Sequence, residues 1–281
     1  MSSSVLYDIP GPRARLRHRI YGLVGALLIA ALLGWVAWKL WDAEQITPEN
    51  WSFLAEPDIL TALLEGLGAT LAAAAIAIVL AVAFGAVFAT GKLSDHGWLR
   101  WPSIAVIEFF RAVPVLLLML FMFLVFGNVL GTFWALVLAL TVYNGSVLAE
   151  IFRAGILAVP KGQREAAFAI GLRKGQVLRL VQAPQAVSTM LPAIVSQCVI
   201  VLKDTALGVA IGAPELTDAA ESIYTDIFFN NPIAVGIVLV AVYVTINYSL
   251  SRLAAWLESR MRRQGKPVVH LEDTGEGSGF G

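Results

Sequence analysis

Charged residues are scarce in this chain of 281 residues, and their charges sum to zero. Asp, Glu, Lys and Arg make up 14% of the sequence, whereas hydrophobic residues make up 58%. A soluble domain has about 25% charged and about 45–50% apolar residues. The apolar excess favours surfaces that face lipid over an unusually large soluble core. Zero net charge gives no support for binding to nucleic acid.

Cysteine and histidine are also rare. Cys198 is the only cysteine, which excludes an intrachain disulfide, and its apolar surroundings in the sequence are typical of a packing residue. The three histidines have no Cys or His neighbour at metal-ligand spacing, so we expect no metal site. The Gly-Lys-Ser/Thr loop of ATPases is missing, because the two Gly-Lys pairs precede Leu93 and Pro267. We therefore expect a chain that is not an enzyme and binds no cofactor itself.

Long apolar runs account for most of the sequence. A helix that crosses a bilayer needs about 20 mostly apolar residues, and six segments meet or approach this length. These segments are residues 20–41, 68–90, 104–126, 132–152, 191–213 and 232–253. They predict an all-α, polytopic transmembrane bundle with six spans. The first segment is too long for a signal peptide and ends in a belt of tryptophans, so we expect an uncleaved anchor.

Lys and Arg are distributed unevenly between these spans. They are concentrated in the N-terminal tail, in the loops after the second and fourth spans, and at the C-terminal end. The loops after the first and fifth spans carry only acidic charges, among them Glu215, for which a solvated rim is the plainest account. The positive-inside rule then places both termini in the cytoplasm. Lys39, at the outer end of the first span, is an exception that can extend to the interface.

The composition divides the chain into three parts. Residues 1–58 comprise the N-terminal tail, the first membrane anchor and an outer loop. Residues 59–260 form a five-span core with a cytoplasmic loop at 153–190, and the Ala- and Gly-rich second span is suited to close helix packing. Residues 261–281 are Gly-rich and charged, which predicts a disordered cytoplasmic tail.

The segment 162–184 is basic and polar, although apolar runs flank it. Apolar side chains recur there at helical offsets, namely Ala166, Ile170 and Val177. This pattern predicts one or two short amphipathic helices, and Gly171 and Gly175 mark a turn between them. Such a helix either lies in the membrane interface or inserts its apolar face into a groove of a partner protein. The residues alone favour neither.

The same segment resembles the signature of ABC-importer permeases, in which Glu-Ala-Ala is followed by a spaced Gly and Pro. The matching residues are Glu165, Ala166, Ala167, Gly171, Val181 and Pro184, and Gly162 precedes them as it does in that family. Ala183 departs from the usual Leu, which affects packing of the loop more than docking. The resemblance implies that this loop docks on a separate ATPase subunit. Glu165 then faces the ATPase, and small residues at 166 and 167 let the helix fit closely.

Other motifs place the resemblance in the histidine, glutamine and glutamate branch, the polar-amino-acid permeases. The similarity covers roughly residues 60–260. It includes Gly68-Ala69-Thr70-Leu71, Glu108-x-x-Arg111-x-x-Pro114, Ala149-Glu150-Ile151-Phe152-Arg153 and Leu202-Lys203-Asp204-Thr205-Ala206-Leu207. Ser146-Val147 departs from the Ala-Tyr of many relatives, so the lining of the substrate path is expected to differ. The N-terminal Leu6-Tyr7-Asp8 points towards the glutamate permeases.

The resemblance implies a type I ABC-importer permease fold in the inner membrane and a role in ATP-driven uptake, with glutamate as the expected substrate. Two ATPase copies would bind ATP and magnesium, and an extracellular binding protein would deliver the substrate. Six spans enclose too little for a full pathway, so a second permease, related but distinct, is expected. The alternative is an ion-coupled secondary transporter, which favours an inverted repeat, and no clear repeat is present.

Several ionisable and polar residues fall within the predicted spans, where such groups are costly and mark buried pairs or water-filled paths. Glu108 with Arg111, and Glu150 with Arg153, are spaced three apart and can neutralise each other. They either fix the position of each span or form a gate whose pairing changes.

Lys203 and Asp204 are adjacent, so they point to different sides of a helix. They either line a cavity at a helix break or belong to a buried ion pair with another span. Lys203 or Arg111 would complement the carboxylates of an acidic substrate. Further candidates for the path are Tyr143, Asn144 and Ser146, for which hydrogen bonding between helices is equally plausible.

Overall fold

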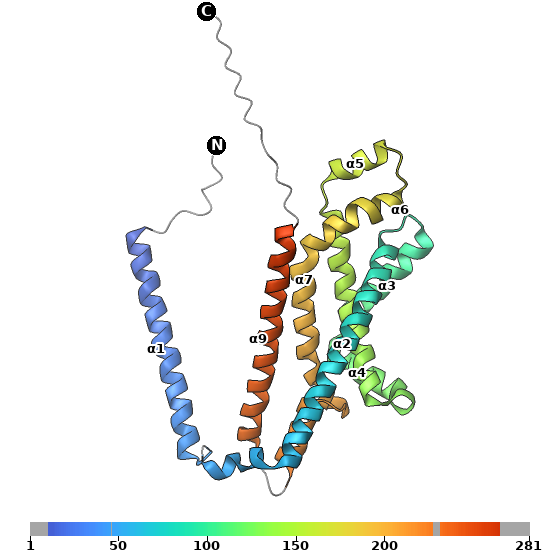
Figure 1. Ribbon diagram of the computed structural model, residues 1–281. Coiled ribbons are helices and arrows are strands. Elements are labelled where there is room, and N and C mark those ends of the chain that lie inside the picture. Colours follow the sequence, from blue (N-terminus) through green and yellow to red (C-terminus); the bar gives the residue numbers. More distant parts are fainter. Residues whose placement is uncertain (1–10, 46, 227–230, 265–281) are drawn as a thin grey trace, which may run out of the picture.

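The computed structural model describes residues 11–45, 47–226 and 231–264 (Figure 1). Regular structure in these residues is entirely helical, without a strand. Five helical stretches in them are long and apolar enough to cross a membrane, namely Arg13–Asp42, Pro57–Lys92, Val115–Leu157, Thr189–Ile211 and Pro232–Leu253. The predicted all-α class with several apolar membrane helices is therefore confirmed.

The predicted third span, residues 104–126, is not one continuous helix. Helix α3 (Gly97–Ala112) ends before Val113, whose backbone is extended, and α4 (Val115–Leu157) begins after Pro114. Proline has no amide hydrogen and disfavours the helical conformation of the residue before it. The span is therefore broken between its two halves, and the continuous span predicted from hydropathy is wrong at this point.

Helix α4 has 43 residues and contains a kink at Gly131, where φ is 80° and ψ is 165°. A straight helix of this length would extend about 65 Å, roughly twice the thickness of the hydrocarbon core. Glycine adopts such backbone angles without steric cost. The kink falls where the sequence predicts the connection between the third and fourth spans, and α4 turns back sharply at the lower right of Figure 1.

The core is formed where α2 (Pro57–Lys92), α4 and α7 (Ala183–Asp204) pack together. Small residues of α2 are fully buried there, among them Ala73, Ala77 and Ala81. A Cβ atom on Gly85 would lie 2.9 Å from Cβ of Leu148, so only glycine permits this approach of α2 to α4. The predicted role of the small residues in packing is confirmed.

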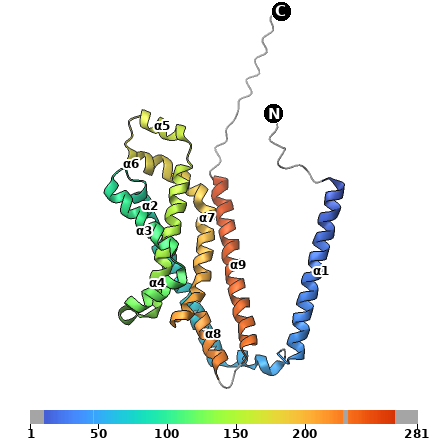
Figure 2. The same cartoon turned by 180° about the vertical axis from the view of Figure 1, so that it is seen from behind.

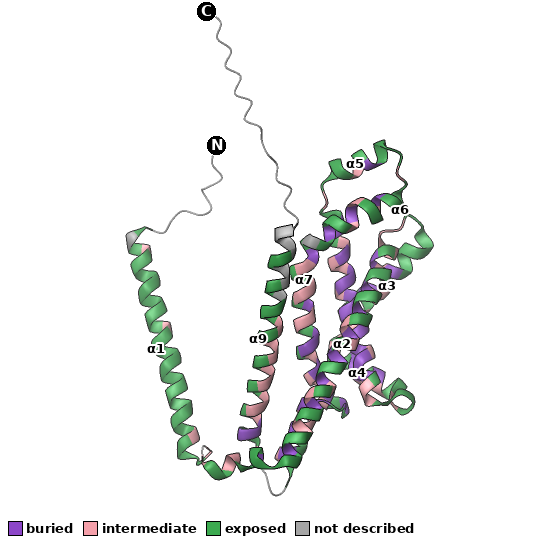
Figure 3. Cartoon of the chain, in the orientation of Figure 1, coloured by how far each residue is buried: buried purple, intermediate pink, exposed green. Residues whose placement is uncertain are grey.

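Helix α1 (Pro12–Asp42) stands apart from the other helices, and Figure 3 shows it exposed along almost its whole length. Its apolar side chains are among the most exposed in the described residues, with Leu23 at 63% and Leu28 at 66%. Trp35, Trp38 and Trp41 are also exposed near the end of the helix. The bundle does not bury this apolar surface, so lipid or a partner chain must cover it.

Short elements gather at two opposite ends of the molecule (Figures 1 and 2). Helix α5 (Lys161–Ala169) and helix α6 (Lys174–Gln176) lie at the same end as the start of α1 and the end of α9 (Pro232–Gln264). The 3₁₀-helix η1 (Pro48–Ala55) and helix α8 (Leu216–Thr225) lie at the other end. We refer to these as the α5 end and the α8 end.

The chain termini differ in part from the sequence-based division. Helix α9 continues to Gln264, so residues 261–264 are helical rather than part of a disordered tail. Residues 265–281 of that tail lie outside the described residues. The same holds for residues 6–10, which carry most of the N-terminal resemblance to glutamate permeases.

Candidate coupling surface and ion-pair network

Helix α5 ends in a turn that requires glycine. Gly171 has φ of 85°, its amide donates to the carbonyl of Phe168 at 2.9 Å, and the amide of Leu172 donates to that of Ala167 at 3.2 Å. These two bonds form a Schellman motif, which satisfies the last carbonyls of a helix. The predicted turn at Gly171 is confirmed, whereas Gly175 lies inside α6 and does not contribute to the turn.

Periodicity predicts only part of what this segment buries. Val177, in the turn that follows, is buried as expected, at 0% exposure, whereas Ile170 is 78% exposed and α5 buries Ala167, at 4%, in place of Ala166. Ile170 is the C-cap of α5, where the helical path ends, so its side chain leaves the predicted apolar face. Glu165, Ala166 and Gly162 are exposed. The exposed surface of α5 therefore carries charged and small residues.

A π-helical turn, η2 (Val177–Gln182), joins α6 to α7. The amide of Ala183 donates to the carbonyl of Leu178, five residues back. Pro184 follows in the first turn of α7 and has no amide hydrogen to donate. The ring of a proline also clashes with the carbonyl four residues earlier in a regular helix. The π-helical turn and Pro184 together mark the junction between the loop and α7.

A groove of about 770 Å³ lies between α5, η2 and the connection from α2 to α3. Arg164, Glu165 and Phe168 line it from α5, and Asp95 and His96 line it from the connection. Lys174 also lines the groove.

The Lys174 ammonium joins the loop to the connection from α2 to α3. It pairs with the Asp95 carboxylate and donates to the carbonyl of Leu93 at 3.2 Å. The hydrogen bond and the positive charge of Lys174 hold the pKa of Asp95 below its usual value. One cation therefore ties α6 to the end of α2.

The ionisable residues predicted in spans three and four meet in one network. Arg111 lies 3.7 Å from Glu108, and the Nε atom of Arg153 lies 3.1 Å from Glu150. Lys92, at the end of α2, pairs with both carboxylates, at 3.0 Å from Glu108 and in closer contact with Glu150. We call these five residues the Lys92 network. Sequence reasoning missed Lys92, because its partners lie 16 and 58 positions away.

Two of the polar candidates in α4, Asn144 and Ser146, are buried and form hydrogen bonds with helix atoms. Asn144 donates to the carbonyl of Leu140 at 3.0 Å and accepts from Nε2 of Gln197 on α7 at 2.5 Å. Ser146 donates to the carbonyl of Val142 at 2.7 Å. Tyr143 is half-buried against the core. The structure thus brings Asn144 to α7 but does not bring these three residues together with Lys203.

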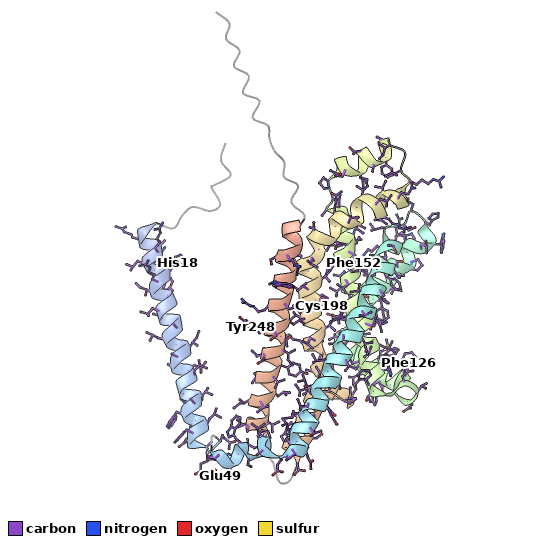
Figure 4. All side chains as sticks on the ribbon, in the orientation of Figure 1. His18, Glu49, Phe126, Phe152, Cys198 and Tyr248 are labelled. Carbon is purple, nitrogen blue, oxygen red and sulfur yellow. The ribbon has the colours of Figure 1, made fainter. Side chains whose placement is uncertain are left out.

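Lys203 and Asp204 lie where α7 changes into the 3₁₀-helix η3 (Thr205–Ile211). Lys203 is exposed and lines an apolar groove of about 450 Å³ between α7, α8 and α9, together with Tyr243 and Asn247. Within the described part of the chain, neither charge forms an ion pair. Cys198, one turn and a half earlier, is half-buried on α7 (Figure 4).

Glu215 was expected on a solvated rim, and this expectation is wrong. The residue is 1% exposed and caps α8, where its carboxylate accepts from the amides of Thr217 at 2.8 Å and Asp218 at 3.1 Å. The hydroxyl of Tyr243 donates to it at 3.1 Å. Burial raises the pKa of Glu215, although these hydrogen bonds oppose the shift. No clear signal in the sequence indicated this role, because Ser, Thr, Asp and Asn are the usual N-cap residues and Glu is not.

Residues 81–263 match the family of binding-protein-dependent transport system inner membrane components. The match covers more than half of the chain, and this protein therefore belongs to that family. It is an integral membrane protein, in agreement with its apolar helices. Among the residues that the structure describes, no group of His, Cys, Asp and Glu side chains is arranged to hold a metal ion.

Relatives with known names are permeases of amino-acid transport systems. The glutamate transport system permease protein GluD of Corynebacterium glutamicum is 40% identical over 236 residues, which cover 81% of this chain and 84% of that protein. The probable glutamine ABC transporter permease protein GlnP of Bacillus subtilis is 36% identical over 207 residues, which cover 72% and 94% of the two chains.

Solved structures show the same arrangement of helices. An amino acid ABC transporter crystallised with histidines is 30% identical, with a TM-score of 0.68 over 74% of this chain and 98% of that chain. An inward-facing methionine ABC transporter, MetNI, has a TM-score of 0.58 at 22% identity, covering 71% and 98% of the chains. The second likeness supports the fold alone.

Proposed function

We propose that this chain is the transmembrane permease subunit of an ATP-driven importer of glutamate. The observation that carries the proposal is the 40% identity to a glutamate permease along most of both chains. The presence of an exposed α5 with Glu165 at the bundle end supports it. The family membership favours this function over the alternative of an ion-coupled secondary transporter.

The proposed topology has six crossings with both termini and α5 in the cytoplasm. The kinked α4 is long enough to supply two crossings, the first together with α3. The start of α1, the end of α9 and α5 lie at one end of the molecule, which is the end rich in Lys and Arg. Both features support the type I ABC-importer arrangement.

Transport then depends on partner chains. The chain has no phosphate-binding loop, so two ATPase copies supply ATP hydrolysis with magnesium and receive α5 at their surface. A binding protein delivers the substrate at the α8 end. A second, related permease completes the path, because six spans enclose too little for a full pathway.

The substrate path is proposed to run along α4 and α7. Asn144 and Gln197 join these helices by a buried hydrogen bond, and Lys203 supplies an exposed cation at the change from α7 to η3. A cation at a helix irregularity suits the carboxylates of glutamate. The Lys92 network lies nearer the α5 end and is proposed to limit access from the cytoplasm.

The docking role of α5 is tested by the substitution Glu165→Lys in the complex with its ATPase. Reversal of an exposed charge at an interface is expected to weaken ATPase binding by more than about tenfold, or about 1.4 kcal/mol, and to abolish glutamate uptake in proteoliposomes. Glu49→Lys, at the opposite end (Figure 4), is the matched control for ATPase binding and should leave that binding unchanged. Normal ATPase binding by the Glu165 variant would show that α5 does not dock there.

A further inference from the structure

Lys92 makes the ion pairs that join different helices within the Lys92 network. Arg111 and Glu108 both belong to α3, and Arg153 and Glu150 both belong to α4, so these pairs are local. Lys92 on α2 contacts both carboxylates, and its side chain is 12% exposed. Without this ammonium, each carboxylate retains a cation on its own helix, but the ion pairs no longer connect α2, α3 and α4.

The same end of α2 is attached to the loop that carries α5. The carbonyl of Leu93, next to Lys92, accepts a hydrogen bond from Lys174 at 3.2 Å. Lys174 also pairs with Asp95, two residues further along. A lysine at the last carbonyls of a helix is favoured by the helix dipole. Residues 92–95 therefore connect the end of α2 to α3 and α4 through Lys92, and to α6 through Leu93 and Asp95.

Close packing holds Lys92 within reach of its partners. A Cβ atom on Gly91 would lie 2.1 Å from Oγ and 3.1 Å from Cβ of Ser103, so glycine allows the end of α2 to approach α3. Ser103 is held in place, because its hydroxyl donates to the carbonyl of Leu99 at 2.8 Å. The position of Lys92 is thus fixed by backbone packing as well as by charge.

We propose that Lys92 is a positioning residue of the transport cycle, which holds the α5 ends of α2, α3 and α4 together as one unit. Residues 93–95 and Lys174 attach this unit to α6. The inference rests on the proposed function, in which α5 docks on the ATPase, and it adds that the ATPase displaces α5 and α6 during the cycle. Such a displacement then moves three helices together, in addition to α7, which continues directly from η2.

The ion pair between Lys92 and Glu150 is stronger than the ion pair between Lys174 and Asp95. The carboxylate of Glu150 is 20% exposed and Lys92 is 12% exposed, so water screens their attraction weakly. Lys174 and Asp95 are 55% and 75% exposed, so their pair is weak and sensitive to salt. Loss of Lys92 is therefore expected to have the larger effect on transport.

The test uses the full complex of permeases, ATPase and binding protein in proteoliposomes and measures glutamate taken up per ATP hydrolysed. Lys92→Met keeps the long apolar stem and removes the charge. It is expected to lower this ratio about fivefold or more, which is the lower range of coupling between distant sites. Lys92→Arg, which retains the charge, should recover most of the ratio. An unchanged ratio for Lys92→Met would overturn the proposal.

A charge exchange tests the second attachment and does not depend on the folding of the Lys92 variants. Asp95→Lys and Lys174→Asp are each expected to lower the ratio, and the double variant is expected to regain part of it. The matched control exchanges Lys39 and Asp42, an exposed pair on α1. Failure of the double variant to recover would overturn the proposal, whereas a wild-type complex without glutamate uptake would overturn the proposed function itself.

Discussion

Two carboxylates at opposite ends of the bundle are stabilised in different ways. Glu150, at the α5 end, lies between the cations of Lys92 and Arg153 and keeps 20% of its side chain exposed. Glu215, at the α8 end, is 1% exposed and is held by two backbone amides and the hydroxyl of Tyr243. The first depends on long, separable side chains, the second on the fixed start of a helix.

This difference suggests different mechanical roles for the two ends. The ion pairs of the Lys92 network can stay intact while the helix ends that they join move as one unit. The start of α8 lacks this freedom, because the amide of Leu216 donates to Thr70 on α2 and a Cβ on Gly66 would lie 2.9 Å from Ala219. The α8 end is therefore suited to remain rigid while the α5 end moves.

The largest expected effect comes from breaking the α8 end. Glu215→Leu leaves the amides of Thr217 and Asp218 and the hydroxyl of Tyr243 without their acceptor. Unsatisfied buried donors cost about 1–3 kcal/mol each, so we expect the free energy of unfolding to fall by about 3 kcal/mol. Glu215→Gln keeps one acceptor oxygen and leaves at least one of these donors without a partner, so it should cost less, about 1–2 kcal/mol. Thermal unfolding of the purified permease in detergent measures both, and equal Tm values would contradict the capping role.

A smaller effect is expected from separating α2 from α3 at the α5 end. Gly91→Ala places a methyl group against Ser103 and should lower the free energy of unfolding by about 1–2 kcal/mol. Gly68→Ala, in the same helix, meets no atom within 4 Å and serves as the control. The control should be neutral or gain up to about 1 kcal/mol from helix propensity. A loss in both variants would point to the helix itself rather than to the contact with Ser103.

The smallest effects are the pH dependences, which have opposite signs at the two ends. Burial raises the pKa of Glu215, so wild type should lose stability relative to Glu215→Gln as pH rises from about 4.5 through the raised value. Lys174 lowers the pKa of Asp95, so wild type should lose stability relative to Asp95→Asn as pH falls from about 3.8. Tm measured from about pH 3 to pH 7 tests both. The same sign for both residues would contradict the comparison.

Local features of the fold were predictable from the sequence because they depend on neighbouring residues. Gly171 adopts positive φ in the predicted turn, and the small residues of α2 pack inside the bundle. The pairs Glu108–Arg111 and Glu150–Arg153 form at helical spacing. Hydropathy found the apolar helices but missed the break at Pro114, because it averages over residues on both sides of a break.

Features that join distant residues were not predictable from spacing. Lys92 follows the predicted second span, residues 68–90, yet it meets Glu108 and Glu150 because Gly91 lets α2 approach α3. Ile170 fitted the apolar period of the loop but is exposed, because the helix ends at that residue. Periodicity predicts a buried face only where the helix continues, and here the Schellman motif at Gly171 ends α5 before Ile170.

The sequence by itself determined that the chain is built of apolar helices with a basic segment between two of them, and that it carries no phosphate-binding loop. These are properties of composition and of neighbouring residues, which act on the chain before it packs. Only the tertiary structure decided that Lys92 joins three helices and that Glu215 is buried as a helix cap. Both depend on how closely α2 approaches other helices, and that distance is set by packing across the whole bundle.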